Sequence, residues 1–96
     1  MSGQGKYMWV GGERYKGDWI ADQRHGRGVQ VWTNGQSYEG EWVCGKQHGR
    51  GVYKWADGKR HEGEWFRNMR HGRGMEITRD NVVTKGEWEK DEMKIN

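Results

Sequence analysis

The stretch YEGEWVCGKQHGRGVYKWADG, Tyr38 to Gly58, contains almost every feature that decides the fold of this 96-residue chain. Aromatic, glycine and charged residues follow one another in it at short, regular intervals. Near-copies lie on both sides, because YKGDW and HEGEW match its first part, and HGRGV and HGRGM match its second. Self-similarity of this kind is the signature of a repeat architecture.

The copies recur with a period of 23 residues, as the spacing of Gly17, Gly40 and Gly63 shows. All seven tryptophans occupy only two positions of the repeat: Trp19, Trp42, Trp65 and Trp88, and Trp9, Trp32 and Trp55. The period predicts one array over residues 1–96. It divides into a partial unit at 1–12, full units at 13–35, 36–58 and 59–81, and a partial unit or cap at 82–96.

The composition excludes both a conventional globular core and a disordered chain. Apolar residues make up 31% of the sequence and charged residues 32%, and 17 residues are glycine, which is poor material for an aliphatic core. Disordered chains, however, lack aromatic residues, and this chain has seven tryptophans and four tyrosines. We therefore expect a thin structure in which aromatic rings lie over backbone.

Each unit contains two short runs of alternating residues, which predict a β-hairpin. In the first run Tyr15, Gly17 and Trp19 point one way, and the residues between them point the other. Asn34-Gly35 and Asp57-Gly58 are strong turn signals, and the glycine-rich HGRG segment is interpreted as a further turn that closes each hairpin. Glycine recurs too often for a helix, at about 1 kcal/mol for each interior position. The predicted fold is all-β: a single extended, twisted antiparallel sheet of consecutive β-hairpins.

Glycines inside strands need a reason, because glycine normally weakens a strand. A run such as Gly51, Tyr53 and Trp55 places two rings and a gap on one face. We expect rings from one strand to lie over the bare glycine backbone of the next, since aromatic side chains can compensate for strand glycines. The prediction is an aromatic-over-glycine layer.

The stretch Tyr38–Gly58 resembles the MORN (membrane occupation and recognition nexus) repeat, whose pattern is similar to YEGEWxxGKxHGxGxxxxxDG. Three phased copies extend the resemblance over nearly the whole chain. It implies a sheet of consecutive hairpins and a non-catalytic module in cytoskeletal or ciliary scaffolds, membrane junctions, or regulatory segments of enzymes such as phosphoinositide kinases. The chain departs from the pattern at His61 and Thr84, which replace tyrosine, and at Asn68 and Asn81, which replace glycine.

The repeated histidines and glycines carry no predicted catalytic, metal or cofactor site. Equivalent positions in successive hairpins lie two strands apart, about 10 Å at ~4.8 Å per strand. Zinc needs nitrogen ligands at ~2.1 Å, so His25, His48 and His71 are not expected to share an ion. Each is expected to hold its own turn by hydrogen bonding or to pack on a ring. GRG lacks the strand, helix and longer glycine pattern of a nucleotide loop.

A row of basic residues is the first candidate surface. Arg27, Arg50 and Arg73 repeat in register, next to Arg24, Lys46 and Arg70, and would form a basic rim along the sheet. Such a row could bind anionic phospholipid, at around 1 kcal/mol per basic residue. The acidic residues on the neighbouring strands and the net charge of only +3 favour a solvated rim instead, and they argue against nucleic acid.

The aromatic face is the second candidate surface, and it would bind a helix or peptide of a protein partner. Its predicted members are Tyr15, Trp19, Trp32, Tyr38, Trp42, Tyr53, Trp55 and Trp65. Tryptophan and tyrosine dominate interface hot spots, and a single-layer sheet cannot bury both faces on itself. The competing interpretation is that the repeat stack itself consumes these rings.

The sequence as a whole favours a non-catalytic protein-interaction scaffold. The single cysteine, Cys44, fits a reducing compartment, and no apolar run reaches the ~18 residues of a spanning helix. We therefore expect a cytoplasmic protein, associated with cytoskeleton or membrane. An anionic-lipid module and a regulatory segment of a larger enzyme are the alternatives. Open sheet edges predict self-association.

Overall fold

The computed structural model describes residues 3–93, which form one open antiparallel sheet of nine strands in sequence order. The strands are β1 (Gly3–Met8), β2 (Arg14–Ile20), β3 (Gln23–Val31), β4 (Ser37–Val43), β5 (Lys46–Lys54), β6 (Arg60–Phe66), β7 (Met69–Ile77), β8 (Val83–Glu89) and β9 (Glu92–Met93). Among these residues no helix is long and apolar enough to cross a bilayer.

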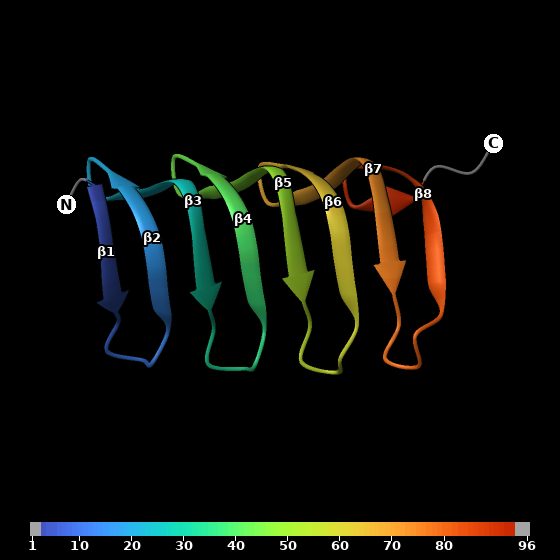
Figure 1. Cartoon of the computed structure of the whole chain (residues 1–96), viewed down its shortest axis with the longest axis horizontal. Helices are drawn as coiled ribbons and strands as arrows, with labels where there is room; N and C mark the ends of the chain where they lie inside the picture. The colour runs from blue at the N-terminus through green and yellow to red at the C-terminus, as the bar shows by residue number, and fades with distance from the viewer. Residues whose placement is uncertain (1–2, 94–96) are drawn as a thin grey trace.

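The strands follow one another along the longest dimension of the molecule, with the two ends of the chain at opposite ends of the array (Figure 1). The extents are 44 × 23 × 16 Å. Every strand pairs with its neighbour in sequence, and every pairing is antiparallel. The predicted all-β array of consecutive hairpins is confirmed.

The hairpins β3–β4 and β5–β6 are closed by the predicted Asn34-Gly35 and Asp57-Gly58 loops, and β1–β2 and β7–β8 are closed by the corresponding loops with Gly11-Gly12 and Asp80-Asn81. Between β3 and β4 the backbone N–H of Trp32 donates to the carbonyl of Gln36 at 2.9 Å. The Asn34 side chain accepts the N–H of Gln36 at 3.0 Å. Gly35 has a φ of +90°, which glycine adopts without steric cost. These turn predictions are confirmed.

The alternate strand pairs, such as β2–β3 and β4–β5, are closed by a two-residue turn, and this turn is not HGRG. It consists of Ala21-Asp22 in the first full unit and Cys44-Gly45 in the second. Both residues of each pair have positive φ, as in the type I′ turn that suits hairpins. HGRG lies inside β3, β5 and β7. The interpretation of HGRG as the closing turn is wrong, and glycine content misled it because these turns use mostly non-glycine residues.

HGRG instead forms a bulge in its strand. Gly17 pairs with Gly28 and Trp19 with Arg24, so Asp18 alone faces the segment His25 to Arg27. The same shift recurs between β4 and β5 and between β6 and β7. Bulges bend the strand that carries them, and the strands curl over near their upper ends (Figure 1). Each strand pair thus has a long arm on the loop side of the bulge and a short arm on the two-residue-turn side.

A row of glycines runs across the whole sheet beside the bulges. Its members pair in turn: Gly5, Gly17, Gly28, Gly40, Gly51, Gly63, Gly74 and Gly86. A Cβ on Gly51 would lie 2.1 Å from the hydroxyl oxygen of Tyr38, and one on Gly40 only 2.4 Å from the Cα of Gly51. Neither contact is sterically possible, so the predicted layer of rings over glycine backbone is confirmed.

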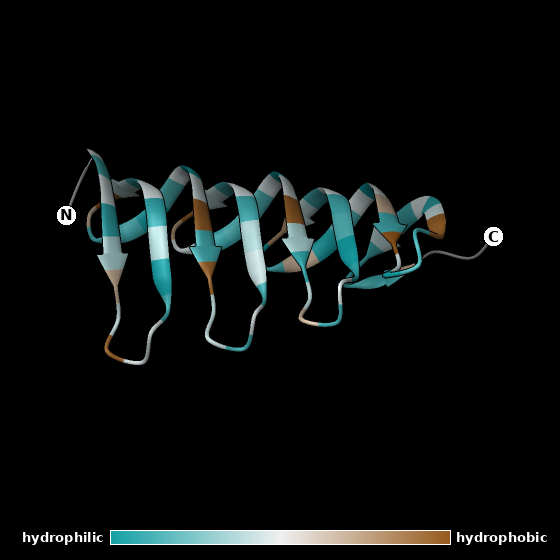
Figure 2. Ribbon diagram, turned by 60° about the horizontal axis from the view of Figure 1, so that its bottom comes forward, coloured by the Kyte–Doolittle hydropathy of each residue, from teal (hydrophilic) through white to brown (hydrophobic). Residues whose placement is uncertain are grey.

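The core is this aromatic layer and little else. The buried apolar residues are Tyr15, Trp19, Tyr38, Trp42, Trp65, Ile77 and Trp88. Figure 2 accordingly shows apolar segments of the ribbon as short, separated bands. We call this side of the sheet the aromatic face and the opposite side, which carries Lys16, Arg27 and Glu39, the charged face.

Candidate functional site

The acidic residue of each Tyr-x-Gly-acid-Trp segment closes the bulge of the following strand. The Asp18 carboxylate accepts the backbone N–H of Arg27 at 3.0 Å, and Glu64 accepts that of Arg73 at 2.7 Å. Glu41 does the same for Arg50. These N–H groups have lost their ladder partners to the bulge, and an unpaired backbone donor costs free energy. The acidic residue and HGRG therefore recur together because the carboxylate accepts a backbone N–H of the bulge.

Tyrosine and tryptophan satisfy the remaining polar groups of the bulge region. The Tyr15 hydroxyl donates to the carbonyl of Asp18 at 3.1 Å, and Tyr38 repeats this bond to Glu41 at 3.2 Å. The indole N–H of Trp42 donates to the Gly28 carbonyl of the preceding strand at 3.2 Å. Burial is the main reason that the pKa of Tyr15 rises to about 12 from its ordinary value of 10.0.

The third full unit breaks this pattern at His61, which stands where Tyr15 and Tyr38 stand in the others. Its side chain is fully buried and packs edge-on against Trp65 and Trp88, and neither ring nitrogen has a hydrogen-bond partner among residues 3–93. Desolvation, followed by the nearby charge of Arg70, lowers its pKa to about 4. The ring is neutral at neutral pH.

The histidines of HGRG lie on the charged face, and those of the first two full units contact the following unit. The Nδ1 atom of His25 accepts the N–H of Cys44 at 3.4 Å, in the turn of the next unit. His48 and His71 lie with their ring centroids 5.2 and 5.7 Å from that of Phe66. Packing and hydrogen bonding were expected of these side chains, although His25 holds the following turn and not its own. The described residues contain no cluster of three or more potential metal ligands.

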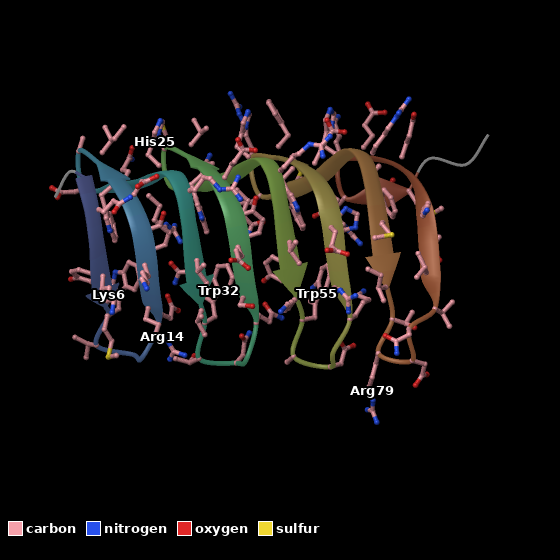
Figure 3. All side chains as sticks on the ribbon, in the orientation of Figure 1. Lys6, Arg14, His25, Trp32, Trp55 and Arg79 are labelled. Carbon is pink, nitrogen blue, oxygen red and sulfur yellow. The ribbon has the colours of Figure 1, made fainter. Side chains whose placement is uncertain are left out.

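The predicted aromatic binding face divides into a buried and an accessible part. The buried part comprises Tyr15, Trp19, Tyr38, Trp42 and Trp65. Trp32, Tyr53 and Trp55 keep part of their surface, as does Trp9 of the first, partial unit. Trp9, Trp32 and Trp55 recur just before the loops, and we call them the tryptophan strip; Figure 3 labels two of them. Tyr53 lies between two members, with centroids 5.6 Å from Trp32 and 4.8 Å from Trp55.

The predicted basic rim does not form one row. Arg24 lies on the aromatic face, with its guanidinium 4.5 Å from the Trp42 ring centre and bonded to the Gly45 carbonyl at 2.8 Å. Arg70 is held by Asp91, whose backbone carbonyl accepts from it at 2.7 Å. Both cations thus stabilise contacts between units. Lys46 is exposed at the start of β5.

Arg27, Arg50 and Arg73 are exposed on the charged face, where acidic residues alternate with them. Each is the cross-strand partner of a glutamate: Glu41, Glu64 and Glu87 respectively. A shallow hollow between two of the arginines is also lined by Glu39 and Glu62. Opposite charges placed across a strand pair stabilise the sheet, and the mixture of signs weakens any net attraction for an anion.

Sequence reasoning missed a second basic group, at the N-terminal end of the charged face. Lys6 pairs with Lys16, and Arg14 lies on the adjacent row of the same face. The three cations surround an apolar floor of Met8, Val29 and Val31, and together they line a hollow of about 500 Å³. Lys6 and Arg14 are labelled in Figure 3. These residues are scattered in the sequence. The available signal was the alternation of side chains along β1, β2 and β3, which places them on the same face.

The geometry of two strands, a bulge and two turns in every 23 residues can be compared with known repeats. The model of the MORN repeat matches residues 1–14, 15–37, 38–60 and 61–82. The chain belongs to the MORN-repeat family. No curated protein matches the chain. Two departures from the MORN pattern have a structural account, because Asn68 and Asn81 adopt φ of +69° and +66°, conformations in which asparagine readily replaces glycine.

Membership of a MORN-repeat array is consistent with a repeat protein that acts in protein or membrane interactions. Two of the surfaces described above are candidates for such contacts. They are the tryptophan strip on the aromatic face and the basic hollow around Lys6, Arg14 and Lys16 on the charged face.

Proposed function

We propose that this MORN-repeat chain is a non-catalytic scaffold that binds an amphipathic helix of a protein partner along the tryptophan strip. The observation that carries the proposal is the partial exposure of Trp9, Trp32 and Trp55 at regular intervals beside the buried part of the aromatic face. Partly exposed aromatic residues on a rigid support are the usual anchors of protein interfaces.

The spacing of the strip suits a helix that lies across the strands. Members of the strip are two strands apart, about 9.6 Å at ~4.8 Å per strand. A helix rises about 10.5 Å over seven residues, so apolar residues at every seventh position would meet successive tryptophans. Around the strip, Lys59 lies 4.6 Å above the Trp55 ring and is bonded to Glu76 at 3.1 Å, which gives the apolar strip a polar border.

The test is affinity capture with the full chain and with a Trp32→Ala/Trp55→Ala double variant. The matched control is Thr33→Ala/Lys54→Ala, which changes exposed residues next to the strip. We expect proteins retained by the wild type and the control to be lost by the double variant while its circular dichroism still shows the folded sheet. An identical set of proteins on all three folded baits would contradict the proposal.

A second candidate function is attachment to anionic phospholipid through the basic hollow. Its support is the grouping of Lys6, Arg14 and Lys16 over the apolar floor of Met8 and Val29, because cations around an apolar patch suit a lipid headgroup and acyl boundary. Each cation near an anionic surface contributes about 1 kcal/mol. This location differs from the rim of six residues that the sequence suggested.

Flotation with phosphatidylserine vesicles distinguishes the two locations. We expect a Lys6→Gln/Arg14→Gln/Lys16→Gln variant to lose flotation, and Arg27→Gln/Arg50→Gln/Arg73→Gln to retain most of it. Loss only in the second variant would place binding on the arginine row, and an absence of flotation in the wild type would remove the lipid candidate.

A further inference from the structure

We propose that the charged face binds an acidic peptide of a partner protein, along a row of side chains next to the loops. We call this the loop-side row. It runs across the strands, each residue paired with the next, in the order Met8, Arg14, Val31, Ser37, Lys54, Arg60, Ile77 and Val83. The row contains three cations and no acidic residue. It lies on the opposite side of the sheet from the tryptophan strip, so it goes beyond the scaffold function proposed above.

Like charges face each other directly at two places on this part of the sheet. Lys54 pairs with Arg60 in the loop-side row, and Lys6 pairs with Lys16 in the neighbouring row. Like charges directly opposite destabilise a strand pair. Among residues 3–93 the three lysines form no ion pair, and Arg60 has only a 3.8 Å contact with Glu62. A bound anion would turn each repulsion into a shared attraction, so this placement of charge favours an anionic ligand.

The hollow at the start of the row suits one large apolar side chain. It has a volume of about 500 Å³, and its floor includes Val29 and Val31, which are half-buried. The exposed side chains of Lys6, Arg14 and Lys16 surround this floor, and Figure 3 shows Lys6 and Arg14 close to the loops. A ligand with an apolar residue beside acidic ones would fill the hollow and meet the cations around it.

The cations of the loop-side row have a spacing that an extended chain can match. Lys54 lies three strands from Arg14 and Arg60 lies four, about 14 and 19 Å at ~4.8 Å per strand. Residues four and six positions apart on one side of an extended peptide are about 13 and 20 Å apart. Three acidic residues with that spacing would therefore face Arg14, Lys54 and Arg60 in turn.

A narrow ligand fits this row better than a broad anionic surface does. Glu39 and Glu62 stand in the neighbouring row of the same face. An anionic bilayer laid on the charged face would meet both carboxylates, whereas a peptide along the loop-side row passes beside them. Val29 and Val31 are also recessed below the cations, while lipid contact favours apolar side chains that reach into the bilayer boundary. The lipid candidate shares the hollow, and it is an outcome of the test.

The test is fluorescence anisotropy with the purified full chain and a labelled synthetic peptide. The peptide has one phenylalanine followed directly by a glutamate, further glutamates four and six positions after the first, and serine elsewhere. We expect saturable binding that weakens as added salt screens the charges. Lysine in place of the glutamates should abolish binding. Alanine in place of phenylalanine should weaken it at least about tenfold, because the hollow loses its apolar occupant.

Variants of the chain locate the site. Lys54→Gln/Arg60→Gln should bind the peptide at least about tenfold more weakly, as expected for lost contacts between charged groups. The matched control is Arg27→Gln/Arg50→Gln, which removes two cations of the same face from beside the bulges and should bind nearly as well as the wild type. Lys54→Gln alone should raise the thermal midpoint, because it removes a like-charge pair. Weaker binding by a chain of undiminished stability cannot result from unfolding.

Other results would overturn the proposal. They are equal losses in the two double variants, equal binding of the lysine peptide, or no binding of the glutamate peptide by the wild type. Flotation on phosphatidylserine vesicles without peptide binding would assign the hollow to lipid instead. The Trp32→Ala/Trp55→Ala variant should bind the peptide as the wild type does, so failure here leaves the proposal for the tryptophan strip unaffected.

Discussion

The carboxylate of Asp18 accepts the backbone N–H of Arg27 at 3.0 Å, across the bulge in which one residue of β2 faces three of β3. Glu64 and Arg73 repeat this bond at 2.7 Å. The acid of one motif and the HGRG of the next are thus a single structural device. It bends the strand, brings the aromatic rings over the glycine row and accounts for the recurrence of both motifs together.

Removal of one bulge carboxylate should destabilise the array. We expect Glu64→Ala to lower the free energy of unfolding by about 1–3 kcal/mol, because the Arg73 N–H loses its charged acceptor. Glu64→Gln keeps an acceptor and should cost less. The measurement is urea denaturation followed by tryptophan fluorescence.

The matched control for Glu64 is Glu62→Ala on the same strand. Glu62 makes only a 3.8 Å contact with Arg60 at the surface, and such pairs contribute about 0–1 kcal/mol. If the two alanine variants unfold at the same urea concentration, the carboxylate does not hold the bulge.

A methyl group on the glycine row should be poorly tolerated. Gly51→Ala would place its Cβ 2.1 Å from the hydroxyl oxygen of the fully buried Tyr38. We expect a loss of about 3 kcal/mol or more, at the upper end for overpacking. Gly11→Ala is the control, since nothing lies within 4 Å of its Cβ. Similar thermal midpoints for the two variants would disprove the ring-over-glycine packing.

Restoring tyrosine at position 61 should stabilise the chain. His61→Tyr would place a hydroxyl where it can donate to the Glu64 carbonyl, as Tyr38 donates to that of Glu41. It would also remove two buried nitrogens that have no hydrogen-bond partner in the described part of the chain. We expect a gain of about 1–2 kcal/mol, measured by urea denaturation. His71→Tyr, at an exposed position, should change stability by less than about 0.5 kcal/mol, and a larger gain there than at position 61 would contradict the account.

The stability of the wild type should fall as the solution is acidified from pH 6.5 to pH 4. The pKa of His61 is about 4 in the fold against 6.5 for an unperturbed histidine. Above pH 6.5 the side chain is neutral in both states, so the shift has no effect on stability. Between the two values only the unfolded chain binds the proton, which favours unfolding by roughly 2–3 kcal/mol in total.

The His61→Tyr variant isolates this contribution from those of the carboxylates. Its stability advantage over the wild type should grow steadily between pH 6.5 and pH 4, as measured by urea denaturation at each pH. An advantage that stays constant over this range would show that His61 titrates normally in the folded chain.

The sequence was sufficient for the features that follow from periodicity. The 23-residue period located the strands, and the alternation of Tyr15, Gly17 and Trp19 assigned the aromatic face correctly. The same alternation predicted that rings lie over glycines, because a glycine between two aromatic residues weakens a strand unless a ring packs over it. The Asn34-Gly35 turn was predicted because its residue types are specific to turns.

The sequence was insufficient where several strands act together. Ala21-Asp22 gives no turn signal, since alanine rarely has positive φ, and HGRG therefore attracted the turn assignment. Arg24 was placed on the rim beside Arg27 because HGRG was interpreted as an exposed turn, whereas in strand β3 the two side chains lie on opposite faces of the sheet. The hollow around Lys6 was missed because it exists only once three strands are in register.

The claim that HGRG is a carboxylate-capped bulge, and not a ligand site or a turn, is tested most directly by amide hydrogen exchange. The rates to compare are those of the Arg27, Arg50 and Arg73 N–H groups in the wild type and in Glu41→Ala. We predict that all three are protected in the wild type and that the variant loses protection at Arg50 alone, by tenfold or more. An Arg50 amide that already exchanges freely in the wild type, or one that the variant leaves protected, would contradict the account.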